Sequence, residues 1–465
     1  MSSLKYIAAS KAVETALALS SHASDQNIEQ LLSILEWIAP AKDKAMVRSV
    51  QQQWTNDEMA GPVIKRLIRE LNPKAREQLV ANLVLNAAWG PMSSRREEFI
   101  AEHGFKPPFA MLISPTMRCN LNCAGCYAGD YDKNDELSFE LMDRILTEAK
   151  SLDIFFITVL GGEPFIRPDL WDLFEKHSDI YFQVYTNGTL LNQGNVDRLA
   201  RTPNVATMIS IEGFEAETDA RRGKGTYREI LAAMDRLHAA GVLFGFSSMV
   251  TRMNLDVIIS DEFNDMLVEK GAFVGWHFLY MPVGPNPDVS LMLTPVQRNR
   301  LRQMGAARIR KTRPIFVMDF WNDAPYVGGC IAGGREYLHI NSFGGIEPCI
   351  FTHFAVDNIK EKSLRECLCS PYFRDIRSRQ PYDQNLLRPC MLIDHPEVFR
   401  DVHGVHHPHP THPGAVSLVN ELAPKLDQYA SDLCSVMDMA WQEDFAEFEY
   451  QPAYQESEAK LKRSA

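Results

Sequence analysis

The sequence contains no long hydrophobic run. No apolar stretch reaches the roughly 18 residues that a membrane-spanning helix needs, and Lys5, Lys11 and Glu14 interrupt the apolar core that a signal peptide would require. Basic residues are in deficit, because 48 lysines and arginines stand against 60 aspartates and glutamates and leave a net charge of −12. Surfaces that bind nucleic acid are normally basic. We therefore expect a cytoplasmic protein without a transmembrane segment that does not bind nucleic acid.

Cysteine is absent from residues 1–105, although the whole chain contains nine. The 465 residues are enough for about three domains, and an odd number of cysteines in so long a chain argues against the disulfide framework of a small secreted protein. In a reducing compartment, clustered cysteines are metal ligands or catalytic thiols rather than bridges. The grouping of the cysteines is therefore the main indication of function.

Periodicity indicates the fold class. Residues 1–105 carry apolar side chains at helical spacing and predict a helical N-terminal region. Residues 106–312 alternate short β-branched or aromatic runs with helical patterns, which predicts an α/β fold with right-handed parallel crossovers. The expected strands of this (β/α)6 partial TIM barrel cover residues 111–114, 154–160, 180–185, 205–211, 242–250 and 273–280. Functional residues should gather at the carboxyl ends of such strands.

The rest of the chain is less regular. Residues 313–400 consist of short segments separated by glycine, proline and cysteine, and we expect a small C-terminal extension there. Residues 401–465 begin with a loop rich in histidine and proline, from His403 to His412, and continue into a C-terminal helix and a polar tail. Neutral imidazoles suit a transition metal, but the prolines favour an irregular surface loop.

The first cysteine group is Cys119, Cys123 and Cys126, directly after the first expected strand. Thiolate is the usual protein ligand of iron-sulfur clusters, and three thiolates leave one iron of a cubane cluster open. A structural zinc site would normally close four ligands. The spacing Cys-x-x-x-Cys-x-x-Cys and its position resemble the radical S-adenosylmethionine superfamily. The resemblance implies a 4Fe-4S cluster that reductively cleaves S-adenosylmethionine to a 5′-deoxyadenosyl radical, which abstracts hydrogen from a substrate.

Further elements that follow the expected strands resemble the cofactor-binding elements of this superfamily. The segment from Gly161 to Pro164 resembles the Gly-Gly-Glu-Pro turn of the superfamily. Its glycines allow another segment of backbone to approach closely, and Glu163 would accept a hydrogen bond from the cofactor ammonium group. Arg222 would pair with the cofactor carboxylate. Many members have an aromatic residue before the third cysteine, but Gly125 stands there, so adenine contact rests on the backbone or on Tyr127. The cofactor-binding residues implied by the resemblance are Tyr127, Gly161, Gly162, Glu163, Pro164, Asn187, Ser210, Glu212, Arg222 and Ser248.

A second cysteine group begins with Cys330. Cys349 ends a predicted hairpin in which Gly344 and Gly345 separate two apolar runs, and an Arg-Pro-Cys segment follows at Cys390. This order resembles the auxiliary-cluster extension of radical enzymes, of the SPASM or shorter twitch type. A full SPASM arrangement needs about seven cysteines, whereas residues 313–400 contain five. The resemblance therefore implies one auxiliary 4Fe-4S cluster, with Cys330, Cys349 and Cys390 among its ligands.

The fourth ligand of this auxiliary cluster stays open. Met-Leu-Ile follows Cys390 where related enzymes often place another cysteine. Cysteines at helical positions are commonly packing residues, which we expect of Cys367 and Cys369. The candidates for the fourth ligand are Cys367, Cys369, Asp394, His395 and a substrate atom.

The substrate is expected between the first cluster and the auxiliary extension. Tyr280 and His277, at the end of the sixth expected strand, are candidates for substrate contact or proton transfer. The helical N-terminus does not resemble the β-rich leader-peptide domain of many peptide-modifying members. We therefore expect a radical S-adenosylmethionine oxidoreductase or transferase that acts on a lipid chain or another small hydrophobic metabolite, with an electron donor such as flavodoxin or ferredoxin.

Two alternatives to this hypothesis remain. The first is a radical S-adenosylmethionine enzyme that modifies peptides or proteins. The second is a non-catalytic iron-sulfur electron-transfer protein or a zinc-binding module. The second alternative would leave the turn from Gly161 to Pro164 without a role.

Overall fold

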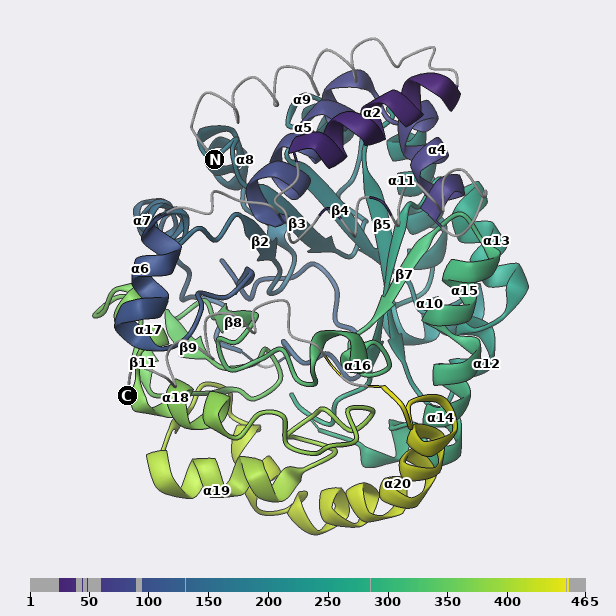
Figure 1. Cartoon of the computed structure of the whole chain (residues 1–465). Coiled ribbons are helices and arrows are strands. Elements are labelled where there is room, and N and C mark those ends of the chain that lie inside the picture. Colours follow the sequence, from purple (N-terminus) through teal and green to yellow (C-terminus); the bar gives the residue numbers. More distant parts are fainter. Residues whose placement is uncertain are drawn as a thin grey trace.

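A ten-stranded sheet forms the centre of the fold in the computed structural model, which describes residues 25–38, 44, 48, 60–88, 94–129, 131–284, 286–448 and 450. The sheet curves into an open barrel with helices on its outside (Figure 1). From one edge to the other the strands are β11 (Asp357–Asn358), β9 (Gly345–Glu347), β8 (Tyr337–Ile340), β1 (Ala110–Ile113), β2 (Phe156–Val159), β3 (Tyr181–Thr186), β4 (Val205–Ser210), β5 (Phe244–Val250), β6 (Val274–Leu279) and β7 (Phe316–Asp319).

Strands β1 to β6 run parallel, with one or two helices between each strand and the next. Each expected strand overlaps an observed one, so the predicted α/β fold and partial TIM barrel are confirmed. The connecting helices are α7 (Phe139–Ser151), α8 (Leu170–Lys176), α9 (Gln193–Arg201), α10 (Glu215–Arg222), α11 (Thr226–Ala239), α12 (Leu255–Ile258) and α13 (Asp261–Glu269).

Helix α7 shows how the sequence specifies these elements. Ser138 caps the helix, because its hydroxyl accepts from the Leu141 backbone N–H at 3.2 Å and so satisfies a donor that a helix start leaves unpaired. One face of the helix carries Met142, Ile145 and Leu146, which are buried in the core between the helices and the sheet. Full burial of each such side chain stabilises the fold by about 1.5–3 kcal/mol.

Side chains along the strands alternate between this helix-facing core and the interior of the barrel. In β3, Phe182 and Val184 are fully buried in the helix-facing core. Tyr181, Gln183 and Tyr185 instead line a cavity inside the barrel. The same alternation in the other strands decides which residues can reach a ligand.

The sheet extends beyond the six predicted strands at both edges. Strand β7 pairs in parallel with β6 after helices α14 (Pro295–Met304) and α15 (Ala306–Thr312). Strand β8 pairs in parallel with β1 and in antiparallel with β9, which confirms the predicted hairpin around Gly344 and Gly345. Because β7 lies beyond residue 312, the barrel sheet continues into the region expected to form the extension.

The C-terminal part contains helices α16 (Ala324–Val327), α17 (Leu364–Leu368), α18 (Pro371–Ser378), α19 (Pro396–His406) and α20 (Ala423–Asp444). The prediction of an irregular surface loop from His403 to His412 is wrong in two respects. Helix α19 extends to His406, because the prolines follow the helix rather than interrupt it. His412 is buried, with Nε2 2.6 Å from the Gly129 carbonyl oxygen, and the short strand β12 (His409–Pro410) pairs with β10 (Phe354–Ala355).

The described N-terminal segments are helical. The helices before residue 80 lie on the side of the molecule opposite to α19 and α20, whereas the helix at residues 94–103 lies beside α17 (Figure 1). They are α2 (Asp25–Ile38), α4 (Ala60–Glu70), α5 (Pro73–Leu79), the π-helix η2 (Val80–Ala88) and α6 (Ser94–His103). Leu67, Leu79 and Leu83 of these helices pack with Tyr181 and Phe273 at the amino ends of the strands. None of the helices in the described residues is both long and apolar enough to cross a membrane.

Candidate functional site

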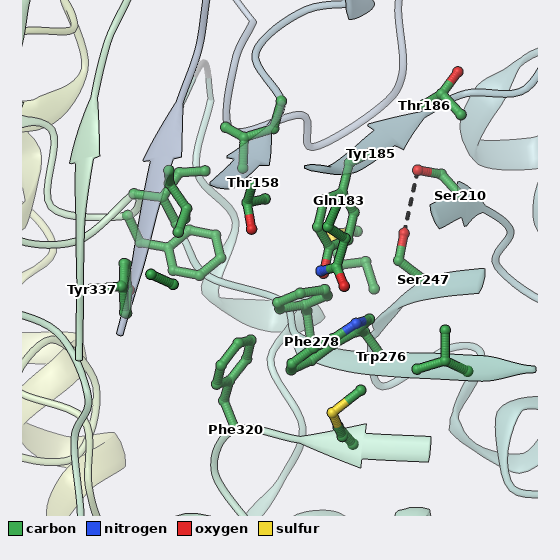
Figure 2. A pocket seen from close by; sticks show the side chains of 18 of the residues that line it. Thr158, Gln183, Tyr185, Thr186, Ser210, Ser247, Trp276, Phe278, Phe320 and Tyr337 are labelled. Carbon is green, nitrogen blue, oxygen red and sulfur yellow. Dashed lines mark hydrogen bonds between the residues drawn. The ribbon is translucent and has the colours of Figure 1, made fainter. Parts of the chain in front are cut away.

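A cavity of about 810 Å³ lies inside the barrel, within the size range of small-molecule sites. Most of its lining is apolar or aromatic. Figure 2 shows Trp276, Phe278 and Phe320 on one side of the cavity and Tyr337 across from Ser210. The cavity reaches all six cysteines that were expected to bind clusters, which are Cys119, Cys123, Cys126, Cys330, Cys349 and Cys390.

The turn after β2 packs against the loop after β1, which carries the first three cysteines. Gly162 N donates to the Thr116 carbonyl oxygen at 2.9 Å, and Glu163 N donates to the Arg118 carbonyl oxygen at 2.8 Å. A Cβ atom on Gly162 would lie 2.1 Å from the Arg118 carbonyl oxygen, so a larger residue would displace the loop. The glycine therefore sets how closely the cysteine loop approaches the end of the sheet. Gly161 and Gly162 also line the cavity.

The carboxylate of Glu163 is fully buried and faces β3. It accepts from the Thr186 hydroxyl at 2.9 Å and from the backbone N–H groups of Asn187 and Phe165 at 2.8 and 3.1 Å. Burial raises the pKa of Glu163 to about 7, although these hydrogen bonds act in the opposite direction. The side chain therefore joins two turns of the site. Whether its carboxylate also accepts from a cofactor ammonium group stays a prediction, because Oε2 accepts one of these three hydrogen bonds and keeps acceptor capacity.

Asn187 connects the turn after β3 to the cysteine loop. Its Nδ2 donates to Asn120 Oδ1 at 2.8 Å and lies 3.8 Å from the Cys119 sulfur. Its Oδ1 accepts from the Thr189 backbone N–H at 2.9 Å. Since Asn187 also lines the cavity, it both positions Cys119 and can reach a ligand.

The environment of the first three cysteines suits a cluster. Burial raises the pKa of Cys119 and Cys123, so a thiolate here needs a compensating positive charge. Arg222 supplies one, with Nη1 4.0 Å from the Cys123 sulfur. No group of three His, Cys, Asp or Glu side chains within the described residues is arranged to hold a single metal ion. Three thiols around one opening fit a cubane cluster, in which each thiolate binds a different iron.

Glu212 and two arginines form a buried charged group after β4. Glu212 Oε1 accepts from Arg221 Nη1 and from Arg222 Nη2, both at 2.5 Å, and Oε2 accepts from Met249 N at 2.9 Å. Burial alone would raise the pKa of Glu212, but the arginine charges outweigh it and hold that pKa below its ordinary value. One carboxylate faces two guanidinium groups. The surplus positive charge beside the cavity suits an anionic ligand group such as a carboxylate.

The positions of the serines in β4 and β5 differ from one expectation about the cofactor contacts. Ser210 and Ser247 both line the cavity, with 3.4 Å between their hydroxyl oxygens (Figure 2). Ser248, which we expected at the cofactor, is fully buried and donates to the Ile211 carbonyl oxygen at 2.6 Å. Because adjacent strand residues face opposite sides, Ser247 and not Ser248 reaches the cavity.

Two further expected residues flank the cysteine loop. Tyr127 lines the cavity, and its ring lies 6.0 Å from that of Phe351. Burial raises the pKa of Tyr127, so its hydroxyl stays neutral. Pro164 begins the short 3-10 helix η3 (Pro164–Ile166) and is buried outside the cavity lining, so it shapes the turn.

The two expected catalytic residues do not face the cavity. In β6, Trp276 and Phe278 point into the barrel (Figure 2), so His277 faces the helices. Neither ring nitrogen of His277 has a hydrogen-bond partner among the described residues, and burial lowers its pKa to about 4. Tyr280 is buried, and its hydroxyl accepts from Asp288 N at 3.0 Å. The alternation in β6 is the signal that identifies Trp276 and Phe278 instead.

The second cysteine group approaches the cavity from the C-terminal extension. Burial raises the pKa of Cys330 and Cys390, and raises that of Cys349 to about 12. The Tyr337 hydroxyl donates to the Cys349 sulfur at 3.0 Å, and Leu392 N donates to the Cys390 sulfur at 3.4 Å. Donors directed at thiolate sulfurs are typical of iron-sulfur sites. These three cysteines therefore fit a second cluster.

The candidates for a fourth auxiliary ligand are engaged elsewhere. Asp394 forms a buried ion pair with Arg298, and His395 Nε2 lies 2.9 Å from a backbone carbonyl oxygen. Cys367 is fully buried in the core and Cys369 packs against it. Neither of these cysteines lines the cavity. The described residues thus present three thiols to an auxiliary cluster.

Known proteins share both regions of this chain. Residues 113–259 match the Radical SAM superfamily, and residues 330–391 match SPASM, an iron-sulfur cluster-binding domain. Mycofactocin maturase MftC of Mycobacterium ulcerans (strain Agy99) is 29% identical over 298 residues, which cover 60% of this chain and 79% of that protein. PqqA peptide cyclase of Methylobacterium sp. (strain 4-46) is 25% identical over 315 residues, which cover 62% of this chain and 79% of that protein.

A solved structure shares the fold. SuiB of Streptococcus suis bound to S-adenosylmethionine has a TM-score of 0.55 at 18% identity, and the match covers 71% of this chain and 87% of SuiB. SuiB bound to precursor peptide SuiA has a TM-score of 0.54 at 19% identity, with 69% and 76% covered. The two matched regions contain the two cysteine groups. The chain therefore contains a Radical SAM superfamily domain at residues 113–259 and a SPASM iron-sulfur cluster-binding domain at residues 330–391. It is an enzyme whose cofactors are S-adenosylmethionine, a 4Fe-4S cluster and an auxiliary iron-sulfur cluster.

Proposed function

We propose that this enzyme abstracts hydrogen from a substrate held between two clusters. Cys119, Cys123 and Cys126 would hold the 4Fe-4S cluster that binds S-adenosylmethionine. Cys330, Cys349 and Cys390 would hold the auxiliary 4Fe-4S cluster. The observation that carries the proposal is that both groups of thiols open into one cavity. A bound 4Fe-4S cluster supplies the electron for reductive cleavage of S-adenosylmethionine.

The residues around the first cysteine group would bind and orient the cofactor. We assign its carboxylate to Arg222, because the guanidinium faces the cavity beside Cys123. Ser210 and Ser247 would bond the ribose hydroxyls from the ends of two adjacent strands. Glu163 and Asn187 would hold the turns that shape this site, in the roles their hydrogen bonds indicate.

The domains would share this work. We propose that residues 106–312 supply the cofactor site and that residues 313–400 supply the auxiliary cluster. The described helices within residues 1–105 and 401–465 would enclose them. An electron donor such as flavodoxin or ferredoxin would reduce the clusters. The strand β7 belongs to both the barrel sheet and the second of these regions, so the cavity can span the boundary between them.

A peptide is the first candidate substrate. One relative is named a peptide cyclase, and SuiB binds a precursor peptide. This changes the order expected from the sequence, where a lipid chain or another small hydrophobic metabolite came first. The hydrophobic substrate is the second candidate, and the mostly apolar lining of the cavity supports it.

Anaerobic reconstitution with iron and sulfide tests the proposal. The loaded enzyme should contain about eight irons per chain, and with reductant and S-adenosylmethionine it should form 5′-deoxyadenosine. The variant in which Cys119, Cys123 and Cys126 are all replaced by alanine should lose that product and about half of the iron. Replacement of Cys330, Cys349 and Cys390 should remove the other half and leave uncoupled cleavage.

Cys434→Ala is the matched control. This cysteine lies on α20 outside the cavity lining, so iron content and product should match the unmodified enzyme. A loaded enzyme without 5′-deoxyadenosine would contradict the proposed function. Unchanged iron content in the Cys330, Cys349 and Cys390 variant would contradict the assignment of the auxiliary cluster.

A further inference from the structure

We propose that the end of the cavity farthest from Cys119, Cys123 and Cys126 is a binding site for the unbranched hydrocarbon chain of a substrate. This apolar chamber is lined by Leu67, Leu83, Phe109, Phe156, Leu243 and Phe273. The inference rests on the proposed function and develops its second candidate, the hydrophobic substrate. That function places the reacting carbon at the other end of the cavity, beside Cys119.

The cavity runs the length of the barrel strands. At the carboxyl ends it is lined by Gly161 after β2 and Asn187 after β3. At the amino ends it is lined by Phe156 and Tyr181, the first residues of the same two strands. Strand β3 has six residues and therefore spans roughly 20 Å. Since the strands are parallel, the lining at their amino ends lies at the far end of the barrel from the cysteine loop.

Helices α4 and η2 cover this far end. Arg66 of α4 donates to the Ala272 and Pro314 carbonyl oxygens at 2.9 and 2.8 Å, just before β6 and β7. Asn82 of η2 donates to the Ile180 carbonyl oxygen at 2.9 Å, just before β3. These bonds attach the helices to the amino ends of the strands. Leu67 and Leu83 are thereby held against the end of the cavity.

The chemistry of the chamber favours hydrocarbon over peptide. Among the described lining residues at the amino ends of the strands, the one charged side chain besides the proposed cluster ligand Cys349 is Glu336, and Lys106 Nζ already donates to it at 2.5 Å. Every residue of a peptide carries a backbone donor and acceptor that are costly to bury without partners. The strand backbones pair with one another in the sheet. An alkyl chain needs no such partners.

The length of the cavity also bears on the occupant. Polar side chains such as Thr158 and Gln183 occur midway (Figure 2). Gln183 Nε2 donates to the Tyr185 hydroxyl at 3.1 Å. An amino-acid side chain attached to a peptide beside Cys119 is too short to pass these residues and reach Leu67. A long acyl or alkyl chain can extend from one end to the other. The structure therefore favours a chain-shaped hydrophobic group in this chamber.

Titration of the reconstituted full-length enzyme with cis-parinaric acid, a fluorescent unbranched fatty acid, tests the inference. Fluorescence should rise to saturation, and hexadecanoic acid should displace the probe while a short Leu-Ala peptide does not. Leu67→Trp and Leu83→Phe fill the chamber and should weaken binding by about tenfold or more, as expected when roughly two methylenes lose their burial. Val296→Trp, at a position 70% exposed on α14, is the matched control and should bind normally.

Leu67→Ala separates a specific effect from misfolding. This variant enlarges the chamber, so relative affinity should move towards fatty acids longer than hexadecanoic acid. Absence of saturable binding, equal displacement by the peptide, or unchanged binding by Leu67→Trp and Leu83→Phe would overturn the inference. Formation of 5′-deoxyadenosine by the same preparation tests the proposed function separately, because it needs no hydrocarbon chain.

Discussion

Arg222 Nη1 lies 4.0 Å from the sulfur of Cys123, while Nη2 of the same guanidinium donates to Glu212 Oε1 at 2.5 Å. The planar fork reaches the two groups from two separate nitrogens, whereas lysine has a single nitrogen on a flexible stem. Arg222→Lys should therefore lower the rate of S-adenosylmethionine cleavage by roughly 10–100-fold, the usual effect of losing an outer contact at a metal site. The rate of 5′-deoxyadenosine formation measures this.

The control for this substitution is Arg228→Lys. Arg228 pairs with Glu215 on the surface, with 79% of its side chain exposed, so the cleavage rate should not change. An equal rate in Arg222→Lys and the unmodified enzyme would contradict the role given to Arg222.

Gly162→Ala should disrupt the first cluster site. The new Cβ would lie 2.1 Å from the Arg118 carbonyl oxygen, so the loop that carries Cys119 and Cys123 must move. Iron content of the reconstituted protein should fall from about eight to about four per chain. Gly404→Ala on α19 is the control, because no atom lies within 4 Å of its Cβ position. That variant should keep all its iron and gain about 0.5–1 kcal/mol of stability. Full iron content in Gly162→Ala would show that the loop tolerates the displacement.

The sequence predicts the barrel well because its strands are local apolar runs bounded by turns and helices. The sequence predicts less well which face of the sheet a given side chain occupies, because neighbouring residues of a strand point to opposite faces and an error of one position reverses the assignment. Ser247 and Ser248 are adjacent in a run of small and apolar residues, so nothing local shows which one points inwards. In β6 the alternation of Trp276 and Phe278 with His277 does contain that information.

Contacts between distant segments lie beyond the reach of local patterns. The cover over the far end of the cavity depends on Arg66 of α4, which donates to the Pro314 carbonyl oxygen at 2.8 Å. These two residues are 248 positions apart in the sequence. The orientation of Glu163 depends in the same way on Thr186 and on Asn187 in the next turn. Motif spacing identifies these residues as part of a site, whereas their hydrogen bonds decide what each one does.

His277→Phe should reduce the loss of stability at acid pH. The pKa of His277 is about 4 in the folded protein and 6.5 ordinarily, so the unfolded chain binds more protons between these values. Stability therefore falls as the pH is lowered from 6.5 through 4. Phenylalanine removes this titration and keeps an aromatic ring beside Phe246. Between pH 7.5 and 4.5 the variant should lose about 2.5 kcal/mol less than the unmodified protein, as measured by urea unfolding at each pH.

His409→Phe, at an exposed position of β12, is the control and should keep the pH dependence of the unmodified protein. An identical pH dependence in His277→Phe would contradict the burial of an uncharged imidazole. The same variant should also retain S-adenosylmethionine cleavage, because His277 faces away from the cavity.

Tyr337→Phe should change the auxiliary cluster without removing it. The hydroxyl donates to the Cys349 sulfur at 3.0 Å, and hydrogen bonds to ligand sulfurs raise the reduction potential by stabilising the more negative reduced state. Loss of this bond should lower the potential by on the order of 50 mV. A redox titration followed by electron paramagnetic resonance measures the change. The titration uses a background in which Cys119, Cys123 and Cys126 are alanine, so that the auxiliary cluster gives the signal.

Tyr372→Phe controls for the general effect of removing a buried hydroxyl. The Tyr372 hydroxyl has no hydrogen-bond partner among the described residues and does not line the cavity, so its removal breaks no bond to a ligand sulfur. A lower reduction potential in Tyr337→Phe but not in Tyr372→Phe would therefore assign the effect to the bond with Cys349. Equal shifts in both variants would indicate a change in the polarity of the surroundings, and no shift in either would mean that Cys349 does not bind the cluster that gives the signal.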